Sequence, residues 1–554
     1  MSASPLYALA TTLESLPDPH NTIRFAQYDT ETRRENKMKN LQIAFCPLVS
    51  GIFGIMLVFS HPSFFGRRKP MIRLTRHFLP VWILVVTMLT ASAADIQPVK
   101  YVFLFIGDGM SFPQQQMAEQ FVQKTENRGL LLNNAFPYRT TTSTYAANAF
   151  ITESGAAATA MATGVRTNNN MISVAPNGEH LETIAEVAHQ SGRKVGIISS
   201  VTINHATPAA FYAHNVSRGN MYEIGLDLIA SGFDYFGGGG VDRHNDTGSS
   251  AYRGDIYDLA REAGYTVART EAEIRALRPG VGKVIALGNA GALDYAMDSG
   301  GEGLRLTCFT RQAIELLDNP NGFFIMVEGG KIDWAGHNND GAAILFDIIE
   351  FDNAIAVAFE FAERHPNNVL IVVTGDHETG ALTLGNRGSA QNSINLLAYQ
   401  KVSRDVLAGL TRTFIRDGGE NMTFDQIKPF ITEKSGLIFS ETESPRVGNL
   451  ILTADEVREL EANFATSKAA VLANQNEGRD VLARTMVRML NNKAGLFWGH
   501  GGHSALPTQT SAWGNQAAQI IHGMRHLTDI GERLKPTVRP LSVQHRTLFC
   551  FDLI

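Results

Sequence analysis

The segment YVFLFIGDGM, residues 101–110, joins an apolar run to a short acidic loop and decides the fold class. Tyr101–Ile106 is rich in aromatic and β-branched residues and does not alternate between apolar and polar positions. A run of this kind is typical of a strand that is buried on both faces of a sheet. The sequence therefore predicts a buried strand that ends shortly before Asp108.

Similar apolar runs follow along the chain, and helical patterns lie between them. The further predicted strands are Lys194–Ser199, Lys283–Leu287, Phe323–Val327 and Val369–Thr374. Helical patterns cover His180–Ser191 and Gly341–Glu363. This alternation predicts a doubly wound α/β fold with a mainly parallel central sheet and helices on both faces. In such sheets, ligands bind beyond the carboxyl ends of the strands.

The segment from about residue 392 to residue 491 has a different character. Strand-like runs are scarce there, and helical patterns cover Asn395–Thr411, Thr453–Ala470 and Gly478–Asn491. We interpret this segment as a helix-rich insertion, or cap, within an α/β domain that extends from residue 95 to residue 540.

The composition narrows the class of protein. Hydrophobic residues make up 44% of the 554 residues and charged residues 18%, so the bulk of the chain can form a core. The formal net charge of −6 gives no basic excess, which argues against a specific nucleic-acid partner. Cys46, Cys308 and Cys550 are far apart and form no CxxC motif, so neither a zinc ribbon nor a disulfide framework is expected.

The N-terminal end contains two apolar runs. Residues 71–93 have the layout of a secretory signal peptide, with a basic start, an apolar run and an A-x-A site at Ala91–Ala93. We therefore expect a periplasmic or secreted protein. Residues 41–59 form a longer apolar run. Residues 1–70 are thus either an over-extended reading frame before a start at Met71, or a membrane-proximal extension with an anchor.

Polar residues follow the ends of three predicted strands, and two histidines lie near the C-terminus. These residues are Asp108, Glu328, Asp333, His337, Asp376, His377, His500 and His503. One such carboxylate after a strand is usually a solvated loop residue. Several carboxylates can converge at one sheet edge only if cations neutralise them. Sites that combine Asp and His ligands suit zinc, and sites made of side-chain oxygens from Thr, Glu and Asp suit magnesium. The pattern therefore predicts metal sites.

The segment TESGAAATA, residues 152–160, predicts a helix that begins near Ser154. Small residues at each position allow close approach, and the free N–H groups of a helix start favour an anion. The alternative is a serine that caps an alanine-rich packing helix. The metal pattern favours a nucleophile, because a serine without a His–Asp pair needs a metal to deprotonate it.

These motifs resemble those of the alkaline phosphatase family over about residues 100–514. The motifs, in the order of the family, are IGDGM at 106–110, TESGAAATA at 152–160, HATPAA at 205–210, VEGGKIDWAGH at 327–337, TGDH at 374–377 and GGHSALP at 501–507. The resemblance implies a catalytic α/β domain that hydrolyses phosphate monoesters with two zinc ions and one magnesium ion. It also implies a homodimer.

The resemblance carries roles over to single residues. Ser154 is expected to be the nucleophile that is phosphorylated and that contacts the second zinc, and Arg218 is expected to clamp the phosphate. The implied metal ligands are Asp333, His337 and His503 for the first zinc, Asp376 and His377 for the second, Thr207 and Glu328 for magnesium, and Asp108 as a bridge. His500 is an alternative to His503, which is preferred because it stands five residues after Trp498, as in some relatives.

Three positions depart from the pattern of many relatives. Glu153 stands where an aspartate often orients the arginine, so its longer side chain puts this contact in question. His205 and Trp334 occupy variable positions in the outer shell of the magnesium site. His214 is interpreted as structural.

The predicted function is therefore phosphomonoester hydrolysis through a phosphoserine. One alternative is a phosphodiesterase or sulfatase on the same core. The sulfatase motif C/S-x-P-x-R is not present at Ser154. Another alternative is a non-catalytic surface protein that binds metal or phosphate, but all the implied ligands are present. The expected partners are small phosphate monoesters, and a membrane is a partner only if residues 41–59 are an anchor.

Overall fold

The computed structural model describes residues 99–300, 303–385, 393–439 and 450–539, which all belong to the compact unit Gln97–Ile554. The predicted signal peptide, the apolar run at 41–59, Cys46 and Cys550 lie outside the described residues. Within these residues, no helix is both long enough and apolar enough to cross a membrane.

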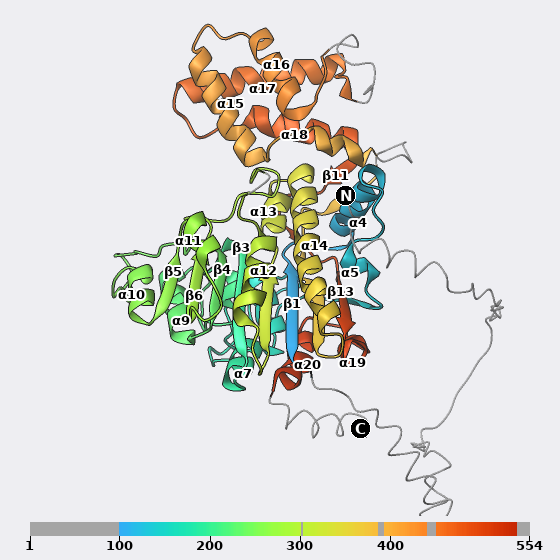
Figure 1. The fold of residues 1–554 in the computed structure, drawn as a ribbon. Helices are drawn as coiled ribbons and strands as arrows, with labels where there is room; N and C mark the ends of the chain where they lie inside the picture. The colour runs from blue at the N-terminus through green and yellow to red at the C-terminus, as the bar shows by residue number, and fades with distance from the viewer. Residues whose placement is uncertain (1–98, 301–302, 386–392, 440–449, 540–554) are drawn as a thin grey trace, which may run out of the picture. The chain divides into compact units, whose positions relative to one another are not determined.

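A nine-stranded sheet forms the centre of the described unit, in the order β2-β13-β8-β1-β7-β3-β4-β6-β5 (Figure 1). Its strands are β1 (Tyr101–Gly107), β2 (Tyr138–Thr142), β3 (Lys194–Thr202), β4 (Tyr235–Gly239), β5 (Tyr265–Ala268), β6 (Lys283–Leu287), β7 (Phe323–Glu328), β8 (Val369–Gly375) and β13 (Thr508–Gly514). The pairings from β8 to β5 are parallel, and β13 is antiparallel to both of its neighbours. All five predicted strands and the mainly parallel sheet are confirmed.

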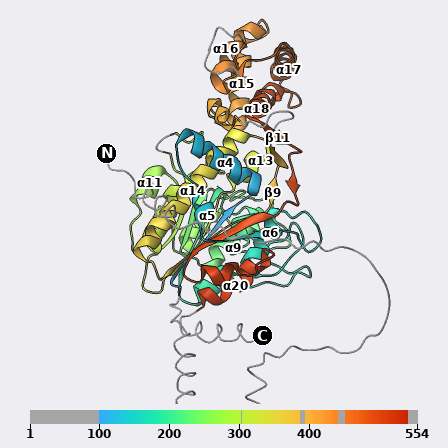
Figure 2. The same cartoon turned by 90° about the vertical axis from the view of Figure 1, so that its right-hand side faces the viewer.

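Helices cover both faces of this sheet (Figures 1 and 2). They are α4 (Phe112–Thr125), α5 (Leu132–Ala135), α6 (Ser154–Thr163), α7 (Ile184–Gln190), α8 (Ala206–Ala209), α9 (Met221–Ser231), α10 (Ile256–Glu262), α11 (Glu271–Ala276), α12 (Leu306–Leu317), α13 (Lys331–His337), α14 (Gly341–Arg364), α19 (Ala517–Ile521) and α20 (Thr528–Val538). Short strands β9 (Glu378–Thr379), β10 (Leu382–Leu384), β11 (Leu496–Trp498) and β12 (His503–Ser504) pair outside the main sheet.

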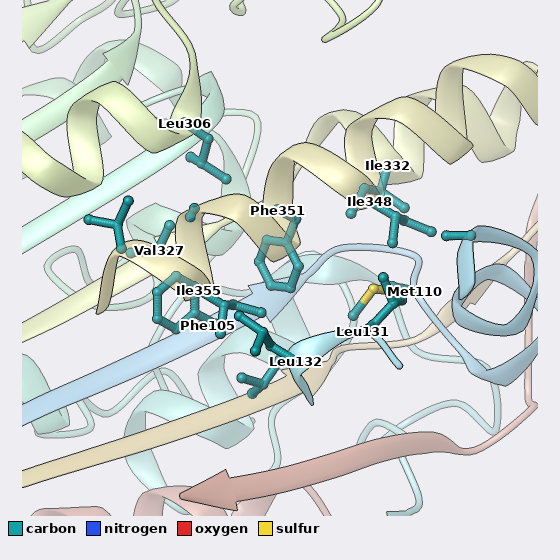
Figure 3. Close-up of a cluster of buried hydrophobic side chains, with 14 of the residues drawn as sticks. Phe105, Met110, Leu131, Leu132, Leu306, Val327, Ile332, Ile348, Phe351 and Ile355 are labelled. Carbon is teal, nitrogen blue, oxygen red and sulfur yellow. The ribbon is translucent and has the colours of Figure 1, made fainter. Parts of the chain in front are cut away.

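Strand β1 shows why its sequence does not alternate. Tyr101, Phe103 and Phe105 pack into a cluster that includes α12 and α14, whereas the residues between them pack into a second cluster with α6, α7 and α20. Figure 3 shows Phe105 beneath Phe351 of α14, and their ring centroids lie 5.9 Å apart. Full burial of one such aromatic side chain stabilises the fold by about 1.5–3 kcal/mol relative to leaving it exposed. Both faces of the strand are therefore apolar.

The segment between β10 and β11 contains η2 (Ile394–Tyr399), α15 (Arg404–Gly418), α16 (Phe424–Ser435), α17 (Ala454–Leu472) and α18 (Val481–Ala494). Helices α15–α18 share a hydrophobic cluster of their own. The prediction of one helix over Asn395–Thr411 was wrong, because the Ser403 side chain caps a new helix there by accepting the N–H of Val406. Helix α16 was not predicted, since Pro429 interrupts its pattern.

Candidate active site

Four neighbouring strands, β8, β1, β7 and β3, deliver polar residues to one edge of the sheet. The register pairs Ile106 of β1 with Thr374 of β8 and with Glu328 of β7, so the loops that follow start side by side. Gly109, in the loop after β1, has φ +71°, and a Cβ there would lie 2.9 Å from the Cα of Asp333. The loop therefore needs glycine to approach α13.

The antiparallel strand β13 explains how the last histidine reaches the same edge. Thr510 of β13 pairs with Thr374 of β8, so the amino end of β13 lies at the carboxyl end of β8. The preceding strand β12 pairs His503 with Thr379. His500 is exposed and its Nδ1 accepts the N–H of Gly502, so of His500 and His503 it is His503 that joins a potential metal group.

Three groups of side chains have the composition and spacing to hold metal ions, with ligand atoms within 4.8 Å of one another. They are Asp333, His337 and His503; Asp108, Asp333 and His377; and Asp108, His205 and Glu328. In the first group, the Nε2 atoms of His337 and His503 are 3.2 Å apart. His337 Nε2 lies 3.3 Å from Asp333 Oδ2. The structure thus brings together the three ligands implied for the first zinc.

The second and third groups contain the implied ligands Asp108, His377 and Glu328, and the implied ligands Asp376 and Thr207 lie beside them. His377 Nε2 of the second group lies 3.4 Å from Asp108 Oδ1 of the same group and 3.2 Å from Oδ2 of the adjacent Asp376. Thr207 Oγ1 lies 3.4 Å from Oδ2 of Asp108, which also belongs to the third group. His205 belongs to this group as well, although the resemblance placed it in the outer shell. It also stacks edge-on against Trp334, with ring centroids 6.0 Å apart.

The carboxylates of these groups are buried without enough hydrogen-bond donors. Asp108 Oδ1, Glu328 Oε1 and Asp376 Oδ2 are buried and accept no hydrogen bond. Burial, together with the charges of Asp376, Asp333 and Glu328, raises the pKa of Asp108 well above its usual value. Burial also raises the pKa of Glu328 to about 7 and that of Asp376 to about 8. Divalent cations would neutralise this cluster, so the donor set fits metal ions.

In the pair formed by Asp333 and His337, the pKa of the carboxylate is lowered, in contrast to the raised values of the other three carboxylates. Burial raises the pKa of Asp333, but the hydrogen bond to His337 and the charges of His377 and His503 lower it overall. The same hydrogen bond raises the pKa of His337 to about 9, against the effect of burial. His337 Nδ1 lies 2.7 Å from the carbonyl of Gly501, which holds Nε2 toward Asp333.

Ser154 is the first residue of α6, is buried, and places Oγ 3.3 Å from His377 Nε2. The helix N-terminus differs from the expectation in one respect. Glu153 is the N-cap, and its carboxylate accepts the N–H groups of Gly155 at 2.9 Å and Ala156 at 2.7 Å. These donors are therefore not available to an anion, because the glutamate side chain is long enough to fold back onto them.

Glu153 also contacts the predicted phosphate clamp. Nη1 of Arg218 donates to Glu153 Oε2, and Nη2 donates to Nε2 of His205 at 3.1 Å. The longer side chain at position 153 thus reaches the arginine after all. Burial and the charge of Arg218 lower the pKa of His205 to about 4, so this imidazole is neutral and can accept. A guanidinium has five N–H groups, so one on each Nη remains for a ligand.

The family model for alkaline phosphatases matches residues 99–539. The chain belongs to the alkaline phosphatase family. It is 29% identical over 452 residues to alkaline phosphatase 4 of Bacillus subtilis (strain 168), which covers 79% of this chain and 89% of that relative. The cold-active alkaline phosphatase of the psychrophile Shewanella sp. has a similar structure, with a TM-score of 0.66, 27% identity, and coverage of 79% of this chain and 99% of that one.

One more relative and one more solved structure are similar to this chain. Streptomycin-6-phosphate phosphatase of Streptomyces griseus is 30% identical over 352 residues, which cover 53% of this chain and 78% of that relative. Alkaline phosphatase of the Antarctic bacterium TAB5 shares the fold, with a TM-score of 0.56, 24% identity, and coverage of 80% of this chain and 99% of that one. The chain is therefore an enzyme of the alkaline phosphatase family with three potential metal-binding groups.

Two side chains that support this alkaline phosphatase site were not predicted. Thr379 Oγ1 donates to Asp333 Oδ1 at 2.5 Å and lies 3.3 Å from His377 Nδ1. The Ser199 hydroxyl, in β3, donates to Glu328. Both residues orient implied ligands. The one signal in the sequence is a small hydroxyl residue near the end of a strand, which is too common to single out.

His214 lies outside the metal groups and has a structural role. Its Nδ1 lies 2.8 Å from the carbonyl of Ser173, and its Nε2 lies 2.9 Å from Glu186 Oε1. Burial lowers the pKa of His214, but the hydrogen bonds to Glu186 and Ser173 outweigh this effect and raise the pKa overall. In turn, burial raises the pKa of Glu186, but His214 and Thr183 lower it overall. The two groups therefore stabilise each other when both are charged.

We expect His214→Gln to lower the stability of the protein more at pH 5.5 than at pH 9. A histidine with a raised pKa stabilises the fold fully below its unfolded pKa of about 6.5, and the effect is lost as the pH rises through the folded pKa. Glu186 contributes above its unfolded pKa of about 4.3, so the pair stabilises the fold from about pH 4.3 up to the raised folded pKa of His214. Measured by thermal unfolding, the loss of unfolding free energy in the variant should be about 1 kcal/mol larger at pH 5.5 than at pH 9. An equal loss at both would show that the pair is uncharged.

Proposed function

We propose that this enzyme hydrolyses phosphate monoesters through a covalent phosphoserine at Ser154, in a site that binds two zinc ions and one magnesium ion. The observation that carries the proposal is the position of Ser154 Oγ, 3.3 Å from His377 and beside buried carboxylate oxygens without donors. The relative named streptomycin-6-phosphate phosphatase supports a phosphate monoester as substrate.

The donor chemistry supports an assignment of each metal. Asp333, His337 and His503, and the neighbouring set of Asp376 and His377, offer the nitrogen and oxygen donors that zinc prefers. Thr207 and Glu328 offer oxygen donors to magnesium, and Asp108 would bridge the second zinc and the magnesium. A TAB5 alkaline phosphatase variant was solved with magnesium in its M3 site. When bound, these cations would make Ser154 more acidic and stabilise the departing oxygen.

The side chains of the chain then have defined tasks. Arg218 binds two non-bridging oxygens of the phosphate through its remaining N–H groups, while Glu153 and His205 fix the guanidinium. Ser154 Oγ attacks phosphorus as its proton passes to water, the P–O bond on the opposite side breaks, and the departing oxygen takes a proton from water to become the alcohol. A water molecule next attacks the phosphoserine, so phosphate is released and Ser154 regains its hydroxyl group.

Arg218→Ala is expected to cost a monoester about 2–4 kcal/mol of transition-state binding, and a diester much less. A monoester dianion offers two oxygens to the guanidinium, whereas one of these oxygens carries an organic group in a diester. The measurement is kcat/KM for p-nitrophenyl phosphate and for its bis ester, on the wild type and the variant. Wild-type activity should be far higher on the monoester.

Arg166→Ala is the matched control for this experiment, because Arg166 is exposed and stacks on the ring of Tyr145 at 4.7 Å. It should leave both substrates unaffected. Equal losses on the two substrates in Arg218→Ala would show that Arg218 does not recognise the charge of the monoester. A preference for the bis ester in the wild type would favour the phosphodiesterase alternative.

We also propose that the enzyme acts outside the cytoplasm and forms a homodimer. The support for the location is the signal-peptide pattern at residues 71–93, and the support for the dimer is the resemblance to the family. N-terminal sequencing of the exported protein should give a mature start just after Ala93. Light scattering should give a molar mass twice that of the mature chain. A start well before Ala91 would contradict the proposed signal peptide.

A further inference from the structure

We propose that the helical insertion is a clamp for the metal ligand His337, and that Arg404 and Asn491 are its positioning residues. The clamped segment is the turn Asn338–Asp340, which directly follows His337 and connects α13 to α14. The inference rests on the proposed role of His337 as a zinc ligand. It assigns the insertion a function in the reaction, although none of its described residues belongs to the three metal groups.

Arg404, the first residue of α15, makes the main contacts with this turn. Its Nη1 donates to the carbonyl of Asn338 at 2.7 Å, and its Nη2 donates to Asn338 Oδ1. Its backbone N–H donates to Asp340 Oδ2 at 2.6 Å. The neighbouring Asp405 accepts the side-chain amide of Asn338 at 3.0 Å. The start of α15 thus binds both ends of the turn.

Two more residues of the insertion complete the clamp. Gln400 Nε2 donates to Asp340 Oδ1 at 2.9 Å, and Asp340 is almost fully buried and caps α14 through the N–H of Ala343. Asn491 of α18 donates its side-chain amide to the carbonyl of Asn339 at 2.7 Å. These contacts come from three parts of the insertion, and all of them reach the same turn. The three parts are the connection between η2 and α15, the start of α15, and α18.

The turn also connects two implied ligands of the same metal. Asn339 Nδ2 donates to the carbonyl of His500 at 2.9 Å and to that of Gly336 at 3.1 Å, so it ties the loop before His503 to the end of α13. Asn339 has φ +50°, in the left-handed region that asparagine adopts more readily than most residues, and these contacts hold it there. His337 itself is 41% exposed and is the least enclosed of the first group. Its position therefore depends on the turn.

The test measures the loss of zinc from the full-length enzyme. Protein loaded with zinc and magnesium is mixed with a chromogenic chelator, and the release of each zinc equivalent is followed over time. Arg404→Ala and Asn491→Ala should each release one equivalent about tenfold faster and leave the other unchanged. Their kcat should fall at limiting zinc and recover with added zinc, with KM nearly constant. Arg404→Lys, which keeps one donor to Asn338, should lie between Arg404→Ala and the wild type.

Arg412→Ala is the matched control, because Arg412 lies on the same helix but pairs with Asp480 at 2.5 Å within the insertion. It should lower the melting temperature without changing zinc release. Unchanged release in both Arg404→Ala and Asn491→Ala, or equal acceleration in Arg412→Ala, would overturn the clamp. A wild type that binds no zinc would overturn the proposed function first, so the two failures can be told apart.

Discussion

Exhaustive chelation is expected to abolish the activity and to lower the melting temperature, and zinc with magnesium is expected to restore both. The physical reason is the crowding of four carboxylates, Asp108, Glu328, Asp333 and Asp376, three of which have buried oxygens without a donor. Without cations these groups repel one another in a medium of low dielectric. Metal at about a thousand times its Kd would stabilise the fold by about 4 kcal/mol.

The measurement pairs p-nitrophenyl phosphate hydrolysis with thermal unfolding, on protein whose metal content is checked by elemental analysis. Asp347→Asn serves as a matched carboxylate control, because Asp347 is buried near Lys331 and lies outside the three metal groups. Its variant should respond to chelation as the wild type does. Full activity in protein shown to be free of metal would contradict the mechanism.

Ser154→Ala is expected to lower kcat by about 10⁴- to 10⁶-fold, the range seen when one member of a preorganised catalytic unit is removed. The substitution removes the oxygen that attacks phosphorus and leaves His377, Asp376 and Arg218 in place. Some activity should remain, since water can attack the bound ester directly. Metal content and the loss of stability on chelation should match those of the wild type, because Ser154 is only one of several donors.

Ser435→Ala is the matched control for this variant. Ser435 is also buried in a helix, but its hydroxyl donates to the carbonyl of Ile431 in α16, within the insertion. Its activity should equal that of the wild type. A Ser154→Ala variant with normal kcat would require a different nucleophile.

The sequence was most informative where local pattern and topology agree. Runs such as Tyr101–Ile106 identify their strands, because a strand buried on both faces has no polar positions. Asp108 and Glu328 then fall at neighbouring strand ends, so a parallel sheet is enough to bring them together. His503 was harder to place, because its position depends on the antiparallel strand β13, which no apolar run marked.

Other features depend on contacts between distant residues and could not be predicted. The use of Glu153 as the N-cap of α6 follows from its fit to Gly155, Ala156 and Asn170 as well as to Arg218. The break before α15 follows from the capping of this helix by Ser403. In the sequence, Ser403 cannot be distinguished from the many serines that cap no helix. The contacts of Arg404 with the turn after His337 join segments more than sixty residues apart. Periodicity contains no information about such pairs.

Trapping the covalent intermediate tests directly whether Ser154 is the nucleophile. Enzyme mixed with labelled phosphate monoester is quenched at low pH, digested, and mapped by mass spectrometry. We expect one phosphorylated residue, Ser154, in the peptide that contains TESGAAATA, and no label in Ser154→Ala. Label on any other residue, or hydrolysis at the normal rate with no trapped phosphate under conditions that preserve phosphoserine, would contradict this expectation.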